Sequence, residues 1–202
     1  MLKKLENYLE VEKWLNILIK ERISRDISVN LNKDENKWII KSKRCKKFIT
    51  IVINEYFYLI GYQPDLLCTN INLENNFFDS IYKELPAPRY NSASNLNIFK
   101  NGSLFDLNFD ILGFAFWMMN RSEEILLESK YYDKHRRFDY KFSHAYKFDY
   151  LSRPIIDEWI KFLTQLIKFN YPNIPLKKFK FRITPTHDVD NPRKYSLISK
   201  KE

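Results

Sequence analysis

Glycine and cysteine are both scarce in this chain, and each shortage excludes a class of site. The 202 residues include only 3 glycines, which argues against a glycine-rich phosphate-binding loop. The 2 cysteines, Cys45 and Cys68, do not have the spacing of metal ligands. Because nothing in the sequence implies export, we expect both to be reduced thiols.

Long apolar runs are absent as well. The first five residues resemble the start of a signal peptide, but Glu6, Glu10 and Glu12 interrupt any apolar core that could follow. No apolar run approaches the length needed to span a bilayer. We therefore expect no signal peptide, no membrane span and a cytoplasmic location.

What the sequence does contain is enough apolar material for a core. The apolar content is 45%, and 16% of the residues are aromatic, so one or two domains are expected. The net charge is +9, but lysine is spread along the chain, which favours a generally basic surface over a nucleic-acid site. The densest cationic cluster, residues 41–47, is interpreted as a solvated connection, with a phosphate-binding patch as the alternative.

Residues 1–60 have the pattern of a small α+β subdomain. Leucines and isoleucines recur at helical spacing over residues 3–23, which predicts an amphipathic helix. Short strands are predicted around residues 27–31 and 38–40, and the apolar run 48–53 predicts a buried strand.

The next hundred residues divide into a predicted linker and a helical part. Prolines, asparagines and serines in residues 61–103 predict an irregular linker. Residues 104–172 contain a short helix, 109–119, that is apolar on all sides and is therefore expected in the core, with Asp106, Asn108 or Asp110 as its cap. A second helix is predicted to begin near Pro154 and to end before Pro172.

Aromatic and basic residues are interleaved in residues 130–150. Rings beside cations can stack on bases or sugars, so the candidate ligand surface comprises His135, Arg136, Arg137, Tyr140 and His144. The alternative is a loop whose rings anchor it to the domain, and this alternative is favoured because half of the rings must cover core. The two histidines do not have conventional zinc-ligand spacing.

A polar cluster at residues 186–190 follows a predicted strand, 178–183, whose apolar and polar residues alternate. If the backbone stays extended, Asp188 and Asp190 point to one side and His187 to the other. Two converging carboxylates form either a hard-cation site or an acid/base pair. The alternative is a simple turn before Pro192.

The sequence Thr186-His187-Asp188-Val189-Asp190 resembles the opening motif of polysaccharide deacetylase-like (NodB-type) enzymes. The preceding residues resemble a domain of unknown function that comes before the catalytic domain in some of these proteins. That resemblance rests on residues 109–124, 133–138 and 153–159, and it covers residues 100–195 better than the first hundred. The chain departs from the pattern at Arg136, where glycine is expected, and the later histidine-containing motif of these enzymes would lie beyond Glu202.

The resemblance implies metal-dependent removal of acetyl groups from envelope or capsular polysaccharides. The divalent metal, most often zinc, is held in these enzymes by one motif aspartate and two later histidines, and the other aspartate is the general base. On this chain Asp188 matches the catalytic base and Asp190 the metal ligand, although these roles could be exchanged. His187 is expected to contact the metal ligands at most, and not the metal itself.

The sequence therefore predicts an α+β accessory domain, with an N-terminal helix, short strands and buried core helices. It is followed, in residues 176–202, by the first β-strand of a truncated α/β (deformed barrel) deacetylase-like domain. This chain alone is expected to hold no cofactor and to be inactive, with a polysaccharide as the partner of the full-length form. The alternative is a stand-alone glycan- or nucleic-acid-binding module that uses residues 130–150; a nucleic-acid partner is not expected, and the oligomeric state is left open.

Overall fold

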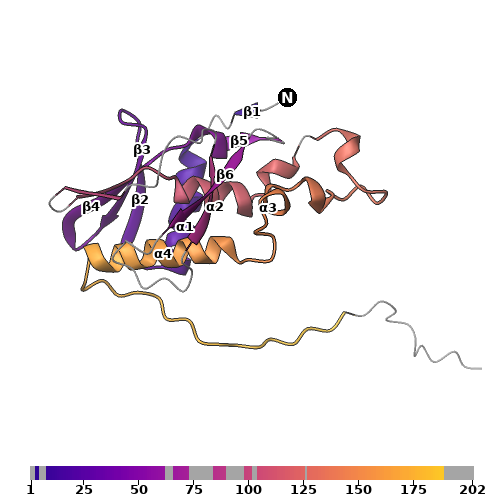
Figure 1. Cartoon of the computed structure of the whole chain (residues 1–202). Helices are drawn as coiled ribbons and strands as arrows, with labels where there is room; N and C mark the ends of the chain where they lie inside the picture. The colour runs from indigo at the N-terminus through magenta and orange to yellow at the C-terminus, as the bar shows by residue number, and fades with distance from the viewer. Residues whose placement is uncertain are drawn as a thin grey trace, which may run out of the picture.

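The computed structural model describes residues 3–4, 8–61, 66–72, 84–89, 98–101, 104–125 and 127–188 (Figure 1). Within these ranges the chain forms an α+β domain that combines helices with a mixed β-sheet. In this described part of the chain, no helix is both long and apolar enough to cross a membrane.

A five-stranded sheet with the order β2-β3-β4-β9-β8 is the largest in the described residues. The strands are β2 (Ile27–Asn32), β3 (Lys37–Ser42), β4 (Cys45–Val52), β8 (Ile98–Asn101) and β9 (Leu104–Leu107). β4 and β9 pair in parallel, whereas the β2–β3, β3–β4 and β8–β9 pairs are antiparallel. The strands predicted within residues 27–53 are confirmed.

One face of this sheet is buried, and its register explains why. Val29 pairs with Ile40, Ile40 with Ile49, and Ile49 with Phe105, so the four side chains form one row across four strands. All four are buried, and burying each side chain of this kind contributes about 1.5–3 kcal/mol. Helix α1 (Tyr8–Arg22) packs against β2, and helix α4 (Ile155–Asn170) packs against β4. The predicted helix of residues 3–23 is confirmed from Tyr8 onward, and Lys3–Lys4 instead form the short strand β1, which pairs with β5 (Leu59–Ile60).

Helix α2 (Ile111–Met119) is the predicted core helix, and every residue from Ile111 to Trp117 is buried. Its N-cap is Asp110, one of the three predicted candidates, whose Oδ1 accepts a hydrogen bond from the Gly113 N–H at 2.7 Å. An accepting side chain at this position satisfies one of the free N–H groups of the first turn. The cap therefore fixes where the helix begins.

The same carboxylate is the centre of a buried hydrogen-bond network. Asp110 Oδ2 accepts from the Tyr58 hydroxyl and from the Asn54 N–H, each at 3.0 Å. The Tyr58 oxygen in turn accepts from Trp38 Nε1 at 2.7 Å. Burial raises the pKa of Asp110 to about 7, against the lowering effect of these hydrogen bonds. The network joins α2 to β3 and to the one-turn 3-10 helix Glu55–Tyr58.

Residues 61–103 differ from the predicted irregular linker, because they supply three strands. β6 (Leu67–Asn72) and β7 (Glu84–Arg89) form a two-stranded antiparallel ribbon, and β8 joins the main sheet. Pro86 and Pro88, which suggested a loop, lie two residues apart in β7. Alternate positions of an antiparallel pair do not donate to the neighbouring strand, so two prolines with this spacing are compatible with a ladder.

Helix α4 holds this ribbon against the domain. Trp159 Nε1 donates to the Pro86 carbonyl at 2.9 Å, and the Arg153 guanidinium donates to the Glu84 carbonyl at 3.0 Å. The same guanidinium forms a salt bridge of 2.5 Å with Glu158, whose side chain is only 2% exposed. The predicted start of α4 is confirmed, since Pro154 occupies its N-cap.

The predicted strand of residues 178–183 does not form in the described part of the chain. Residues 174–188 have no regular secondary structure, and Figure 1 shows this segment leaving the end of α4 as an extended trace. Phe179, Phe181 and Ile183 are 68%, 91% and 74% exposed. A strand needs a neighbour for its backbone hydrogen bonds, and no strand of the described residues pairs with this segment.

Candidate functional site

The deacetylase-like motif lies at the far end of the extended segment. His187 and Asp188 are described, and both are exposed, whereas Asp190 lies outside the described residues. Among the residues that the structure describes, no three His, Cys, Asp or Glu side chains form a group that could hold a metal ion. His187 and Asp188 therefore do not make up a zinc site by themselves, since zinc takes four ligands.

The start of this segment is attached to the domain. The Ser24 hydroxyl donates to the Pro175 carbonyl at 2.7 Å, and the Lys177 N–H donates to the Ile23 carbonyl, also at 2.7 Å. Beyond Lys177, the guanidinium of Arg22 lies 5.7 Å from the centre of the Phe179 ring. The segment is thus anchored to the loop after α1 at Pro175 and Lys177, and its apolar side chains Phe179, Phe181 and Ile183 are exposed beyond that point.

The aromatic-basic segment, residues 130–150, is folded mainly against itself. Asp133 accepts hydrogen bonds from the His135 and Arg137 N–H groups and forms a salt bridge of 2.8 Å with the Arg137 guanidinium. These bonds lower the pKa of Asp133 to about 2, and the hydrogen bonds from Arg137 make the largest contributions. Arg136 has a φ of 59°, so it adopts the left-handed conformation for which glycine is expected at this position.

The rings of this segment pair with one another. The Tyr140 and Tyr146 rings meet edge to face with centroids 5.3 Å apart, and the Tyr131 and Phe142 rings meet at 5.1 Å. His135, Arg136, Arg137 and Tyr140 remain exposed, as a ligand surface requires. The ring-to-ring contacts of Tyr140 with Tyr146 and of Tyr131 with Phe142 also fit the alternative, in which the rings anchor the loop.

His144 does not belong to that surface, and its inclusion in the predicted ligand surface is corrected here. It is 5% exposed, and its ring lies between Tyr150, whose hydroxyl is 2.6 Å from Nδ1, and the Leu67 carbonyl, 3.2 Å from Nε2. Because a carbonyl can only accept, Nε2 carries the proton and Nδ1 accepts from the tyrosine. Burial lowers the pKa of His144 to about 4, so the ring is neutral and structural.

Glu123 completes this buried cluster. Its Oε2 accepts from the His144 N–H at 2.9 Å. Burial raises the pKa of Glu123 to about 7, and the nearby Glu124 charge raises it further. The cluster connects the 3-10 turn Ser122–Glu124 with the short helix α3 (His144–Lys147) and with β6. All its polar contacts are internal, which indicates a structural role.

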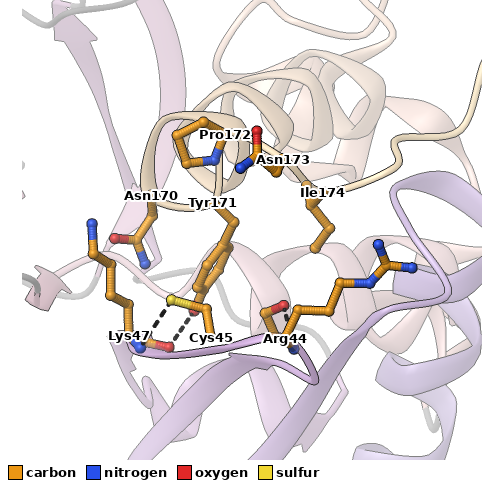
Figure 2. Close-up of a pocket in the computed structure, with 9 residues that line it drawn as sticks. Arg44, Cys45, Lys47, Asn170, Tyr171, Pro172, Asn173 and Ile174 are labelled. Atoms are coloured by element: carbon orange, nitrogen blue, oxygen red, sulfur yellow. Dashed lines mark hydrogen bonds between the residues drawn. The ribbon is translucent and has the colours of Figure 1, made fainter.

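A pocket of about 210 Å³ opens between the β3–β4 turn and the residues that end α4 (Figure 2). Its lining residues come from positions more than a hundred residues apart: Ser42, Arg44, Cys45, Lys47, Asn170, Tyr171, Pro172, Asn173 and Ile174. The turn belongs to the cationic cluster of residues 41–47. The pocket therefore combines basic side chains with an apolar wall.

Tyr171 joins the two sides of this pocket. Its hydroxyl lies 3.1 Å from the Ile40 carbonyl and 2.9 Å from the Lys47 carbonyl, and it can donate to either. Burial raises the pKa of Tyr171 to about 12, so the hydroxyl stays protonated at neutral pH and remains a donor. Because the end of α4 is bound to the β3–β4 hairpin in this way, the shape of the pocket is fixed by the fold.

Asn170 is the buried polar group of the pocket. It is 3% exposed. Its polar neighbour is the Tyr171 hydroxyl, and a hydrogen bond from the Asn170 side chain lowers the pKa of Tyr171 against the larger effect of burial. Figure 2 shows the amide nitrogen turned toward Cys45, with the Lys47 side chain beside it.

The sequence pointed to half of this pocket. The cationic run of residues 41–47 was recognised, with a phosphate-binding patch as the alternative interpretation. Asn170 gave no signal, because an asparagine at the end of a predicted helix is normally a capping residue. The pairing of this asparagine with the turn depends on how α4 packs against β4.

The model of one protein family, described as a family of unknown function (DUF7033), matches residues 6–172. No curated protein and no solved structure matches the chain.

Proposed function

This chain belongs to the DUF7033 family of unknown function, and from that premise we propose that residues 6–172 are an accessory domain placed before a polysaccharide deacetylase-like catalytic domain. In this proposal residues 178–190 are the first strand and the opening motif of that second domain. The activity of the whole protein would be hydrolysis of acetyl groups on envelope or capsular glycans, with a divalent metal.

The observation that carries the proposal is the exposed alternation of Phe179, Phe181 and Ile183. Exposing three such side chains forfeits about 1.5–3 kcal/mol each relative to burial. The pattern is that of a strand with one buried face, and strands of α/β domains obtain their burial from neighbouring strands and helices. The family match ends at residue 172, just before this segment, which agrees with a domain boundary there.

The stand-alone binding module has less support. His144, one of its five candidate residues, is buried, and Arg137 is already paired with Asp133. The tyrosine rings of the segment contact one another, so fewer faces are free to stack on a base or a sugar.

The test is to express the complete reading frame and to measure acetate release from acetylated glycans with and without added zinc. We expect metal-dependent release that is lost in Asp188→Asn, because the base is removed while the size of the side chain is kept. The matched control is Lys180→Ala, in the same segment, which should retain the activity. Acetate release that survives Asp188→Asn, or a reading frame that stops at Glu202, would refute the proposal.

A further inference from the structure

The extended segment leaves the accessory domain at a fixed point, because the turn after α1 holds it. Ser24 is 1% exposed, and its hydroxyl donates to the Pro175 carbonyl at 2.7 Å. Two residues later the Lys177 N–H donates to the carbonyl of Ile23, which is fully buried. Both contacts are made by residues of the core, so the chain cannot leave this point without disturbing the core. Lys177 is therefore an anchored exit.

Arg22, the last residue of α1, makes the next contact and joins three parts of the structure. Its guanidinium forms a salt bridge with Asp157, in the first turn of α4, and lies 5.7 Å from the centre of the Phe179 ring. The Arg22 and Asp157 side chains are 41% and 56% exposed. A cation–π contact contributes little at an exposed site and more where water is excluded. The contact with Phe179 is therefore strengthened by a partner that covers it.

The predicted strand of residues 178–183 begins directly after the exit. Its first residue, Lys178, is one position beyond the bound Lys177 N–H, and a residue extends a chain by at most about 3.3–3.6 Å. A domain in which this strand is buried therefore has no linker to separate it from the accessory domain. It must lie against the C-terminal end of α1 and the N-terminal end of α4.

The surface around the exit is polar and carries charges of both signs. Glu21 lies 3.9 Å from the Lys177 ammonium group, and Arg25 is exposed beside the anchor. Interfaces between the domains of one chain are more polar than obligate interfaces between subunits. The chemistry of this surface therefore fits a domain that is covalently attached to it.

We propose that the ends of α1 and α4 form a docking surface for the domain that begins at residue 178, with Arg22 as the positioning residue that holds its first strand. In the docked state the guanidinium is enclosed between Asp157 and the Phe179 ring. The occupant is the continuation of this chain and not a separate protein. The inference rests on the proposed function only for the existence of the second domain, and it requires no acetyl hydrolysis.

Side-chain footprinting with mass spectrometry tests the docking, on the complete reading frame and on the 202-residue chain. Carbodiimide should label Asp157 about tenfold more slowly in the complete form, as a docked fraction of about nine in ten requires. Asp34, exposed in the turn between β2 and β3, is the control and should keep its labelling rate. Hydroxyl-radical oxidation of Phe181, which is 91% exposed, reports separately whether a second domain has folded on the strand.

Arg22→Met tests the positioning residue. The substitution keeps an unbranched side chain at an exposed helical position and removes the guanidinium, so Asp157 should be labelled at nearly the same rate in both forms while Phe181 stays protected. Comparing the two forms of one variant cancels the effect of losing the salt bridge itself. Lys20→Met, at an exposed position of the same helix, is the matched control and should keep the difference seen in the parent.

The two labels separate the possible failures. If Phe181 is protected in the complete form while Asp157 is labelled equally in both forms, the docking is refuted and the second domain stands. If both residues are labelled equally in the two forms, or if the reading frame stops at Glu202, no second domain folds on this strand, and the proposed function fails as well. If Arg22→Met keeps the difference seen in the parent, Arg22 does not position the strand.

Discussion

Replacing Gly113 by alanine tests the buried network around Asp110. A Cβ atom at this position would lie 2.3 Å from Asp110 Oδ2 and 2.6 Å from the Tyr58 hydroxyl oxygen. Both distances are far shorter than van der Waals contact, and neither neighbour is the free end of a long side chain. The carboxylate must therefore move, and it cannot move without releasing the groups that it accepts from.

The cost follows from the bonds that are lost. Losing the N-cap costs about 1 kcal/mol. The Tyr58 hydroxyl is left buried without an acceptor, at about 1–3 kcal/mol, and the half-buried Asn54 N–H loses its hydrogen bond, at about 0.5–1.5 kcal/mol. The higher helix propensity of alanine returns about 1 kcal/mol. The net loss is about 1.5–4.5 kcal/mol, a large part of the 5–15 kcal/mol that ordinarily stabilises a domain.

Urea and thermal unfolding of Gly113→Ala measure this loss directly. At about 2–4 °C per kcal/mol for a chain of this length, the melting temperature should fall by about 10 °C. The control is the same substitution in an Asp110→Ala background, where the clash with the carboxylate is gone and only the contact with the Tyr58 hydroxyl remains, so Gly113→Ala should cost clearly less than in the parent. If Gly113→Ala alone raises the stability, as it would in an ordinary helix interior, the account of the network is wrong.

Three further predictions concern the other buried groups and the tail. Between pH 4.5 and 7 the folded state keeps a proton on Glu123 that the unfolded state loses, so the contribution of this group to stability falls as the pH rises. In Glu123→Gln this dependence is absent, so the free energy of unfolding should decrease by about 3 kcal/mol less over that pH range than in the parent. An unchanged pH profile would contradict this. Arg153→Ala should cost about 3–5 kcal/mol in chemical unfolding because Glu158 is left buried and unpaired, and Arg153→Ala/Glu158→Ala should cost less than the single variant. Trypsin should cut the folded chain first after Lys178, Lys180 or Arg182, which are exposed outside any helix or strand, and mass spectrometry can detect these cuts; resistance at these sites as long as at the residues of α4 would show that the segment is packed.

Much of the fold could be predicted because it is encoded locally. The alternation in residues 27–53 and the helical spacing before Arg22 describe single elements whose buried side is visible in the pattern itself. The apolar stretch of α2 has the same property, and Asp110 was among the residues expected to cap it. These elements need no knowledge of their neighbours to be recognised.

Pairings between distant segments could not be predicted in this way. The β6–β7 ribbon was hidden by prolines that are harmful in a central strand but tolerated at alternate positions of a ribbon. The partners of Asp110 are Tyr58 and Asn54, more than fifty positions earlier, and no local pattern relates them. The predicted strand of residues 178–183 shows the reverse case, since its pattern is clear but the residues to pair with it are not among those described.

The candidate site residues show the same limit of local sequence patterns. Residue type identified the cationic turn around Arg44 and the aromatic-basic segment, but exposure decided their roles. His144 has the same chemistry as His135, and only packing against Leu67 and Tyr150 makes it an internal residue. Asn170 lines the pocket only because the end of α4 packs against the β3–β4 hairpin, which is a property of position and not of residue type.

The parallel pairing of β4 with β9 has a consequence for the order in which the chain folds. The hairpins from β2 to β4 join neighbouring segments and can close within microseconds, whereas Thr50 and Asp106, which are hydrogen-bonded across the β4–β9 boundary, are 56 positions apart. During synthesis the ribosome releases the first hairpins several seconds before β9 emerges. For that interval the edge of β4, with Ile49 and Ile51, has no partner strand. We expect this nascent intermediate, and not the finished domain, to be the species most prone to aggregate.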